Sequence, residues 1–319
     1  MSAIEKAARP IHAPAALFAG HRIGAMILRH LYTLRRSKLR VLELMYWPTM
    51  QFFLWGFIST FFVEHSSWLA RAGGVLISAV LLWDVLFRAN LGVALSFIEE
   101  MWSRNLGSLF VTPLRPVELI AALIIMSLVR TTIAVAPAAV LALPLFGTWA
   151  FSLGPPLAAF YFNLLFMGCS VGLLASALVL RFGLAAESIC WLGIFLMAPV
   201  ACIYYPVETL PVWLQWLAWS LPAAHVFEGM RAVLFDGAFR WDLFASASGL
   251  NLLYLGLSAG FFLRMFRVAR ERGLLLQQGI GHTLFVRRAP DSPPPRPSPI
   301  KGEGETCRTV SDLRPKEGG

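Results

Sequence analysis

The chain has 319 residues, of which 57% are hydrophobic and only 14% are charged, and its mean hydropathy is +0.66. A soluble domain would carry about 25% charged residues, so the composition argues against a water-soluble protein and indicates an integral membrane protein. The net charge of +9 fits the basic cytoplasmic loops of such a protein. The arginines form no patch interleaved with aromatic residues, which excludes nucleic-acid binding as the main function.

The N-terminal segment 1–40 predicts a cytoplasmic amphipathic helix. It begins without a continuous apolar core, so no cleavable signal peptide is expected. Within 17–38 the apolar residues recur with helical spacing, while Arg22, Arg29 and Arg36 follow one another at intervals of seven. This pattern is typical of a helix that lies in the lipid headgroup layer with a basic face toward water. A solvated helix of a small N-terminal domain is the alternative.

Residues 41–275 predict a domain with six membrane spans. About twenty apolar residues are needed to cross roughly 30 Å of hydrocarbon. Pro48 and Pro137 fall inside spans, where they predict kinks rather than breaks. Arginine and lysine are concentrated before the first span and after the last, which places both termini in the cytoplasm. The predicted spans are about 42–63, 74–96, 119–143, 156–180, 185–204 and 244–264.

Between the last two spans, residues of about 205–237 predict a short helical hairpin on the outer side. Prolines cut it into two helical segments too short to cross, and its tryptophans favour the lipid–water interface. Glu228 and Arg231 have the spacing of a helical ion pair. The candidate residues of this re-entrant or interfacial hairpin are Pro211, Trp213, Trp216, Pro222, His225, Glu228 and Arg231. The segment 276–319, rich in Pro, Gly and charge, predicts a disordered cytoplasmic tail.

Motifs for chemistry are missing from the sequence. It contains no GxxxxGK[ST] phosphate loop and no HExxH, and its Cys and His residues lack metal-ligand spacing. We therefore expect no catalytic residues, no metal and no cofactor in this chain, and an energy source in a gradient or in another polypeptide.

Of the charged residues within predicted spans, three lie well away from the span ends. Asp84 and Arg88 are four residues apart in the second span, with the acid first, which favours a helical ion pair. Arg130 lies in the third span. Such residues often form a proton relay or a substrate contact, and the alternative is a pair that locks helices together. An arginine beside the carboxylate favours its ionised form, which makes a proton relay the weaker interpretation.

The loop of about 97–118 lies between the second and third spans. It is not apolar enough to cross the membrane, and its mixture of acids, arginines and prolines is not that of a flexible linker. Glu99 and Glu100 are adjacent, so on a helix they do not face each other. Residues 97–111 predict a short amphipathic helix after a span that ends near Ser96. Its apolar side would carry Ile98, Met101, Trp102 and Leu109, Pro113 and Pro116 would end it, and Glu118 would begin the next helix. Such an elbow suits the docking of a partner.

Two motifs in this order resemble the permease subunits of type-2 ABC exporters, a family that includes polysaccharide, nodulation-factor and antibiotic export permeases. The first is GSLFVTPLRPVE, Gly107 to Glu118, which resembles a family pattern like G-x-L-x-x-x-T-P-L-x-x-x-E but has one residue fewer between the leucine and the threonine. The second is LPAAHVFEGMR, Leu221 to Arg231, at the end of the hairpin. One departure is that family members often carry an acid–base pair just before the glycine, whereas here Glu99 and Glu100 stand further upstream.

The resemblance implies an all-α permease of a bacterial inner membrane that works with a separate ABC ATPase, with ATP and magnesium bound there. It also implies a second permease copy, most simply identical, and export of an amphiphilic, glycan or drug-like substrate whose identity stays open. The ATPase would dock on a coupling loop that contains Glu99, Glu100, Arg104, Gly107, Leu109, Thr112, Pro113, Leu114 and Glu118. The alternatives are a gradient-driven carrier that uses Asp84, Arg88 and Arg130, and a membrane-embedded transferase.

Overall fold

Every regular element in the described part of the chain is a helix, as predicted. The computed structural model describes residues 20–65, 67–103, 114–146, 154–183 and 187–271, apart from some side chains near helix ends. These residues all belong to one compact unit. The α-helices are α1 (Gly20–Arg36), α2 (Lys38–His65), α3 (Ser67–Trp102), α5 (Pro116–Phe146), α6 (Pro155–Phe182), α7 (Glu187–Met197), α8 (Val212–Ser220), α9 (Pro222–Asp236) and α10 (Trp241–Glu271), and η3 (Val207–Thr209) is a single 3₁₀ turn.

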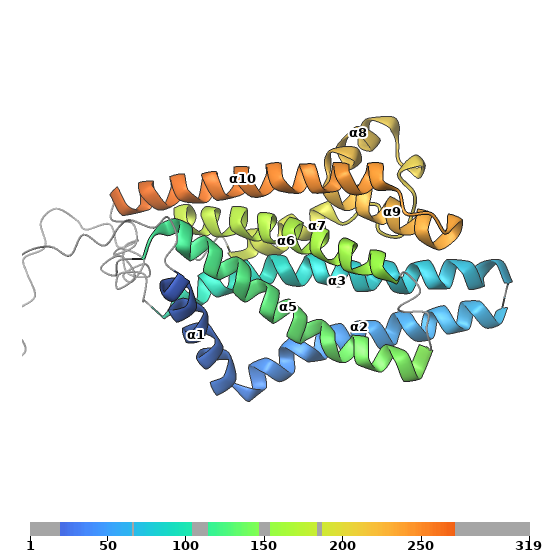
Figure 1. Ribbon diagram of the computed structural model, residues 1–319, viewed down its shortest axis with the longest axis horizontal. Coiled ribbons are helices and arrows are strands. Elements are labelled where there is room, and N and C mark those ends of the chain that lie inside the picture. Colours follow the sequence, from blue (N-terminus) through green and yellow to red (C-terminus); the bar gives the residue numbers. More distant parts are fainter. Residues whose placement is uncertain (1–19, 66, 104–113, 147–153, 184–186, 272–319) are drawn as a thin grey trace, which may run out of the picture. The chain divides into compact units, whose positions relative to one another are not determined.

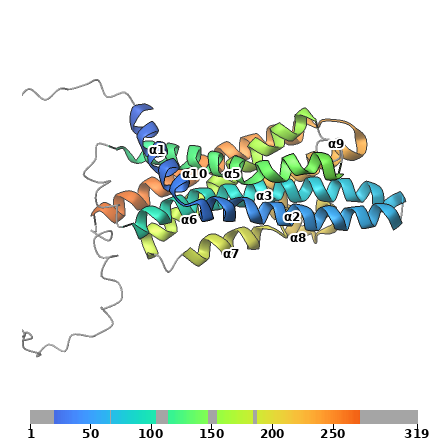
Figure 2. The same cartoon turned by 90° about the horizontal axis from the view of Figure 1, so that it is seen from below.

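Four of the described helices are long and apolar enough to cross a membrane. These stretches are Val75–Trp102, Pro116–Leu141, Pro155–Phe182 and Trp241–Glu271. They coincide with the second, third, fourth and sixth predicted spans. In Figure 1 α10, α6 and α3 run side by side, and in both views α2 lies along α3 (Figure 2). The all-helical membrane class is therefore confirmed.

The first and fifth predicted spans differ from these four. Helix α2 has 28 residues and includes Pro48 without a break, but a Tyr, a Trp and a Gln near its middle make it less apolar. Helix α7 has only 11 residues, which gives a length of about 16 Å, too short to cross a bilayer. The prediction of one continuous helix over 185–204 is wrong. The helix ends at Met197 because Pro199 disfavours helical backbone at Ala198.

Small residues set the closest helix crossing, which joins α3 and α6. A Cβ added at Gly168 would lie 2.4 Å from the carbonyl oxygen of Leu86, and one added at Gly172 would lie 2.6 Å from that of Asn90. Two glycines four residues apart on one face let the helix backbones approach closely, as in membrane helix pairs generally. The side chains around this crossing are buried, so α3 and α6 form the centre of the bundle.

Polar groups join the other long helices to this centre. On α5, Ser127 packs against Gly92 and donates a hydrogen bond of 2.8 Å to the carbonyl of Ala89. On α10, Asn251 Nδ2 donates to the backbone and side-chain oxygens of Asn163 on α6, both at 2.9 Å. Interhelical hydrogen bonds of this kind add to helix packing inside a bilayer, where apolar burial alone contributes little.

The predicted short helices are present, with one change. Helix α1 is amphipathic, and its buried residues Met26, His30 and Leu34 recur every four positions. They face the protein, with Met26 in the same core as residues of α3 and α5. The predicted hairpin segment contains α8, for which Pro211 is the N-cap residue, and α9, which begins at Pro222. Residues 97–102, predicted as the start of a separate helix, instead continue α3.

Candidate functional site: carboxylates at the ends of α3 and α5

Glu99, in the last turn of α3, joins three helices. Arg130 of α5 donates to its carboxylate through Nη2 at 2.7 Å, and Arg40 of α2 donates through Nη1 at 3.1 Å. The Arg130 side chain is only 7% exposed, whereas that of Arg40 is 44% exposed. The two ion pairs of one carboxylate therefore lie in different environments, since the buried pair is screened far less than the exposed one.

Glu100 points to a different helix from its neighbour. Its Oε2 accepts a hydrogen bond of 2.7 Å from Arg29 of α1, and its Oε1 lies 3.4 Å from His30 Nε2. His30 is buried, and its Nδ1 donates to the carbonyl of Met26 at 2.9 Å. The expectation that Glu99 and Glu100 do not face each other fits this geometry, and both acids hold basic partners.

Glu118 fixes the start of α5. Its Oε2 accepts the backbone N–H of Arg115 at 2.9 Å. Because α5 begins at Pro116, Arg115 is the residue that precedes the helix and Glu118 is its third residue. This arrangement is one half of a capping box, with proline in the favoured first position. The Nη1 atom of Arg22 on α1 lies 3.8 Å from the same oxygen. The last residue of the first motif thus stabilises a helix end.

These contacts show where some residues of the predicted coupling loop lie. The described carboxylates Glu99, Glu100 and Glu118 face basic side chains of other elements. Leu114 packs against the main core, Ile98 and Met101 are buried as predicted, and Trp102, predicted on the apolar side, is exposed instead. The predicted residues Arg104, Gly107, Leu109, Thr112 and Pro113 lie outside the described residues.

Sequence reasoning did not find the partners of these acids. Arg22 and Arg29 were interpreted only as a basic face toward water, yet both face carboxylates. Arg40 is one of the basic residues before the first predicted span, which the sequence uses only to orient the chain in the membrane. The seven-residue spacing of arginines marks a common face of the helix, but it does not indicate which span this face meets.

The charges predicted inside spans separate into two groups. Asp84 and Arg88 form the predicted pair, with Nε 3.4 Å from Oδ2. Arg130 instead pairs with Glu99, which lies fifteen residues beyond Asp84, or about 22 Å along α3. The three residues therefore do not form one site, which weakens the carrier interpretation. Among the described residues, no group of His, Cys, Asp and Glu could hold a metal ion.

The hairpin residues hold an irregular segment in place. Arg231 forms the predicted ion pair with Glu228 at 3.1 Å, and it also donates to the carbonyls of Cys202 (2.8 Å), Ile203 (3.3 Å) and Tyr205 (2.9 Å). Glu228 in turn accepts the N–H of Val207 at 2.8 Å. Cys202 has a φ of 55°, a strained value for a residue other than glycine. The Glu228–Arg231 pair thus provides hydrogen-bond partners for backbone groups of this segment that are not paired within a helix.

The rest of the hairpin presents aromatic side chains. His225 packs edge-on against Trp219, with ring centroids 5.0 Å apart. Trp213 and Trp216 on α8 are 71% and 76% exposed. Exposed tryptophans of this kind are enriched at the membrane–water interface. The predicted aromatic surface is therefore present.

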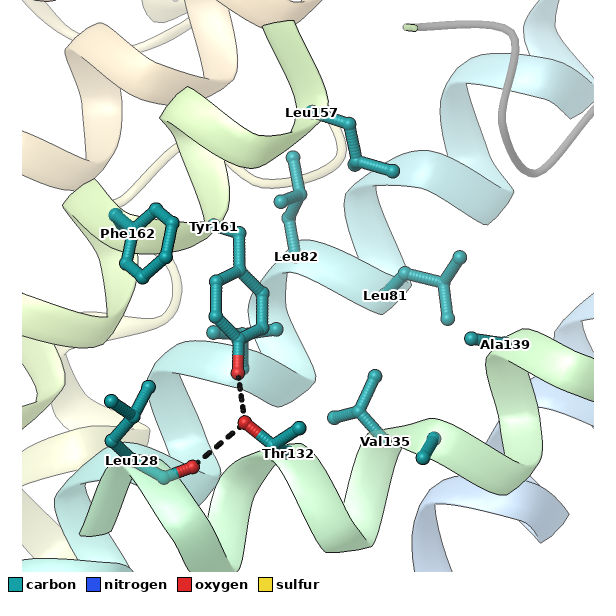
Figure 3. Close-up of a pocket in the computed structure, with 11 residues that line it drawn as sticks. Leu81, Leu82, Leu128, Thr132, Val135, Ala139, Leu157, Tyr161 and Phe162 are labelled. Carbon is teal, nitrogen blue, oxygen red and sulfur yellow. Dashed lines mark hydrogen bonds between the residues drawn. The ribbon is translucent and has the colours of Figure 1, made fainter. Parts of the chain in front are cut away.

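A cleft of about 490 Å³ opens between α5 and α6, over α3. In Figure 3 Leu81, Leu82 and Val135 lie on the α3 and α5 sides, and Tyr161 projects from α6. The Tyr161 hydroxyl lies 3.1 Å from Thr132 Oγ1. Apart from this hydroxyl pair, the lining side chains are apolar.

Long apolar helices, close glycine crossings and charges paired between helices define a multi-pass integral membrane protein. A family model described as ABC-2 type transporter matches residues 25–235, about two thirds of the chain, and the chain belongs to this family. Its domains are the membrane components of ABC transporters, so an ABC ATPase is the implied partner. A comparison with curated proteins gives no match.

Proposed function

We propose that the chain is the permease subunit of an ATP-driven exporter in a bacterial inner membrane. Two copies, most simply identical, would enclose the path of an amphiphilic, glycan or drug-like substrate. Both termini and the loop of 97–118 would lie in the cytoplasm, where a separate ATPase docks on this loop. ATP and magnesium would be bound by that partner. Helix α2 and the segment from α7 through Pro206 would complete six crossings.

The observation that carries the proposal is the set of ion pairs made by Glu99, Glu100 and Glu118. Glu99 and Glu118 lie on either side of residues 104–113, the part of the loop expected to meet the ATPase. Through Arg40, Arg130 and Arg22 these acids reach α2, α5 and α1. A displacement of the loop would therefore be transmitted to several helices together. Coupling further requires that the ATPase, in its different nucleotide states, bind the two permease conformations with different affinity.

A second observation supports the assembly of two copies. The side chains of α2 that face away from α3 are large, apolar and exposed, among them Leu42, Leu54, Phe57 and Phe61. Apolar residues exposed on a membrane helix face either lipid or another helix. Because α2 also carries Arg40, an ion-pair partner of Glu99, a neighbouring copy packed on α2 would sense movement of the loop.

The test is co-purification from the native membrane. The tagged chain in mild detergent should retain a P-loop ATPase in stoichiometric amount, identified by mass spectrometry. Leu109→Asp together with Thr112→Asp should release it. These two positions are chosen because Leu114 packs in the core and its replacement would disturb folding.

The matched control places two acids on another exposed apolar surface, Trp213→Asp with Trp216→Asp on α8. This variant should keep the ATPase. If the wild-type chain carries no ATPase, or if the control loses it as readily as the loop variant, the coupling role of the loop is wrong. Transport by the purified chain alone in response to a proton gradient would favour a carrier.

A further inference from the structure

Helix α10 presents an apolar face to the surroundings of the protein. It is the least buried of the four described helices that are long and apolar enough to cross a membrane. Beyond its first turn, the large exposed side chains are leucines, at 73%, 55% and 61% for Leu252, Leu253 and Leu257. In a membrane protein such side chains face lipid chains or another helix.

The exposed surface of α10 changes from apolar to basic within about two turns. Arg264, Arg267 and Arg270 are all exposed, and Arg264 follows Leu257 by seven residues, or about 10 Å along the helix. Cations in the last turn stabilise the C-terminal end of a helix, which accounts for Arg270 but not for Arg264. The exposed side chains of α10 themselves therefore mark the point at which the helix leaves the hydrocarbon.

Arg181, at the end of α6, lies at the same level. Helices α6 and α10 pack side by side and both begin on the right in Figure 1, and Asn163 of α6 pairs with Asn251 of α10 at 2.9 Å. Arg181 follows Asn163 by 18 residues. Arg267 follows Asn251 by 16, so the two arginines lie within about 3 Å of one level. Arg181 is also exposed.

No acid of the described residues neutralises these arginines. Each lacks an ion-pair partner there, in contrast to the arginines that hold Glu99, Glu100 and Glu118. Helix α10 has two acids, of which Asp242 pairs with Arg240 at the opposite end and Glu271 joins no arginine. The partner that complements such a surface is anionic, and a guanidinium forms two parallel hydrogen bonds with the oxygens of a phosphate.

We propose that the arginine surface, formed by Arg181, Arg264, Arg267 and Arg270, binds the phosphate groups of anionic phospholipids whose acyl chains cover the leucines of α10. Basic residues beside the end of a membrane helix favour anionic headgroups by about fivefold each. A second copy packed on α10 fits less well, because two-fold symmetry would bring the arginines of both copies together. The inference requires only that α10 crosses the membrane, so it does not depend on the exported substrate or on the ATPase.

The probe is a phosphatidylglycerol with a photoreactive diazirine at the head end of one acyl chain. It is added to the full-length chain in vesicles of phosphatidylcholine, followed by irradiation and mapping of chymotryptic peptides, since loss of an arginine leaves their cleavage sites intact. We expect labelling of the ends of α6 and α10. Replacement of part of the phosphatidylcholine by unlabelled phosphatidylglycerol should suppress it, and zwitterionic phosphatidylethanolamine should not. Equal suppression by both lipids would overturn the proposal.

Matched variants separate a local site from an effect of net charge. The triple variant R264Q/R267Q/R270Q should lower the labelling of α10 by at least about tenfold. The control R35Q/R36Q/K38Q removes the same charge from exposed residues where α1 meets α2, which also lack an acidic partner among the described residues. It should label α10 as the wild type does. Full labelling of the α10 variant, or an equal loss in the control, would contradict a lipid site on α10.

The other possible occupants give different results with the same α10 variant. Retained lipid labelling together with loss of the co-purifying ATPase would identify a surface that docks a protein. A cross-link between the α10 helices of two copies would identify an interface between copies. Either result would overturn the proposal, whereas lost labelling with the ATPase retained supports it.

Discussion

The two ion pairs of Glu99 should contribute very unequally to stability. Replacement of Glu99 by Gln removes the charge that faces Arg130, whose side chain is 7% exposed. An uncompensated buried charge costs about 3–5 kcal/mol. The Glu99 side chain is itself 17% exposed, so water offsets part of this cost and we expect about 2–3 kcal/mol.

Replacement of one arginine at a time tests this reasoning. With Arg130→Met, Glu99 keeps Arg40 as a partner, and the cost should fall to about 1–2 kcal/mol. With Arg40→Gln, an exposed pair is lost, which should cost less than about 1 kcal/mol. The double variant E99Q/R130M should recover part of the cost of E99Q, because no charge is then left buried.

The assay is reversible unfolding in mixed detergent and SDS micelles, followed by circular dichroism of the helices. The free energies of unfolding of the wild type, the three single variants and the double variant complete a double-mutant cycle. If Arg40→Gln costs as much as Arg130→Met, or if the double variant is less stable than E99Q, burial does not determine the strength of these pairs.

Three further predictions concern other parts of the fold. Gly172→Ala should destabilise by about 1–3 kcal/mol, because its Cβ would meet backbone atoms of α3. Gly256→Ala, with open space around it in the middle of α10, should instead stabilise by about 0.5–1 kcal/mol, and equal effects in thermal unfolding would contradict the close crossing. Arg231→Met should leave three carbonyls of the hairpin without their donor and cost about 2–4 kcal/mol. Proteolysis at residues 198–207 should then be faster. Unchanged proteolysis would show that the segment keeps its structure without Arg231. Asp84→Asn should preserve most of the transport activity in membrane vesicles, since the residue is paired within its helix, and complete loss would restore the proton-relay interpretation.

The helices were predictable because their signal is local. The apolar run of 156–180 coincides with α6 at Pro155–Phe182, since composition alone decides which segments enter a bilayer. The end of α7 is not predicted because the apolar run continues past Pro199 to Ile203. Apolar composition does not distinguish helical backbone from irregular backbone. Arg231, far along the chain, satisfies that backbone.

The ion pairs of the candidate site could not be predicted from the sequence. Glu99 and Arg130 are 31 positions apart, and their contact depends on the relative rotation of α3 and α5, which Gly92 and Ser127 set by close packing. The composition and the family pattern indicate the loop of 97–118, but neither predicts which helix the side chain of each acid contacts. The cleft was also not predicted, because a hollow depends on the packing of three helices.

The oxygen of Glu118 that caps α5 is also the one nearest Arg22 of α1. One carboxylate oxygen therefore serves as the hydrogen-bond acceptor for the N–H just before α5 and as the ion-pair partner of α1. If α1 moves toward α5, the guanidinium comes within hydrogen-bond distance of that oxygen, which can accept it beside the N–H of residue 115. A shift of α1 would in this way strengthen or weaken the ion pair at the first turn of α5, so the amphipathic helix and the start of α5 are linked electrostatically.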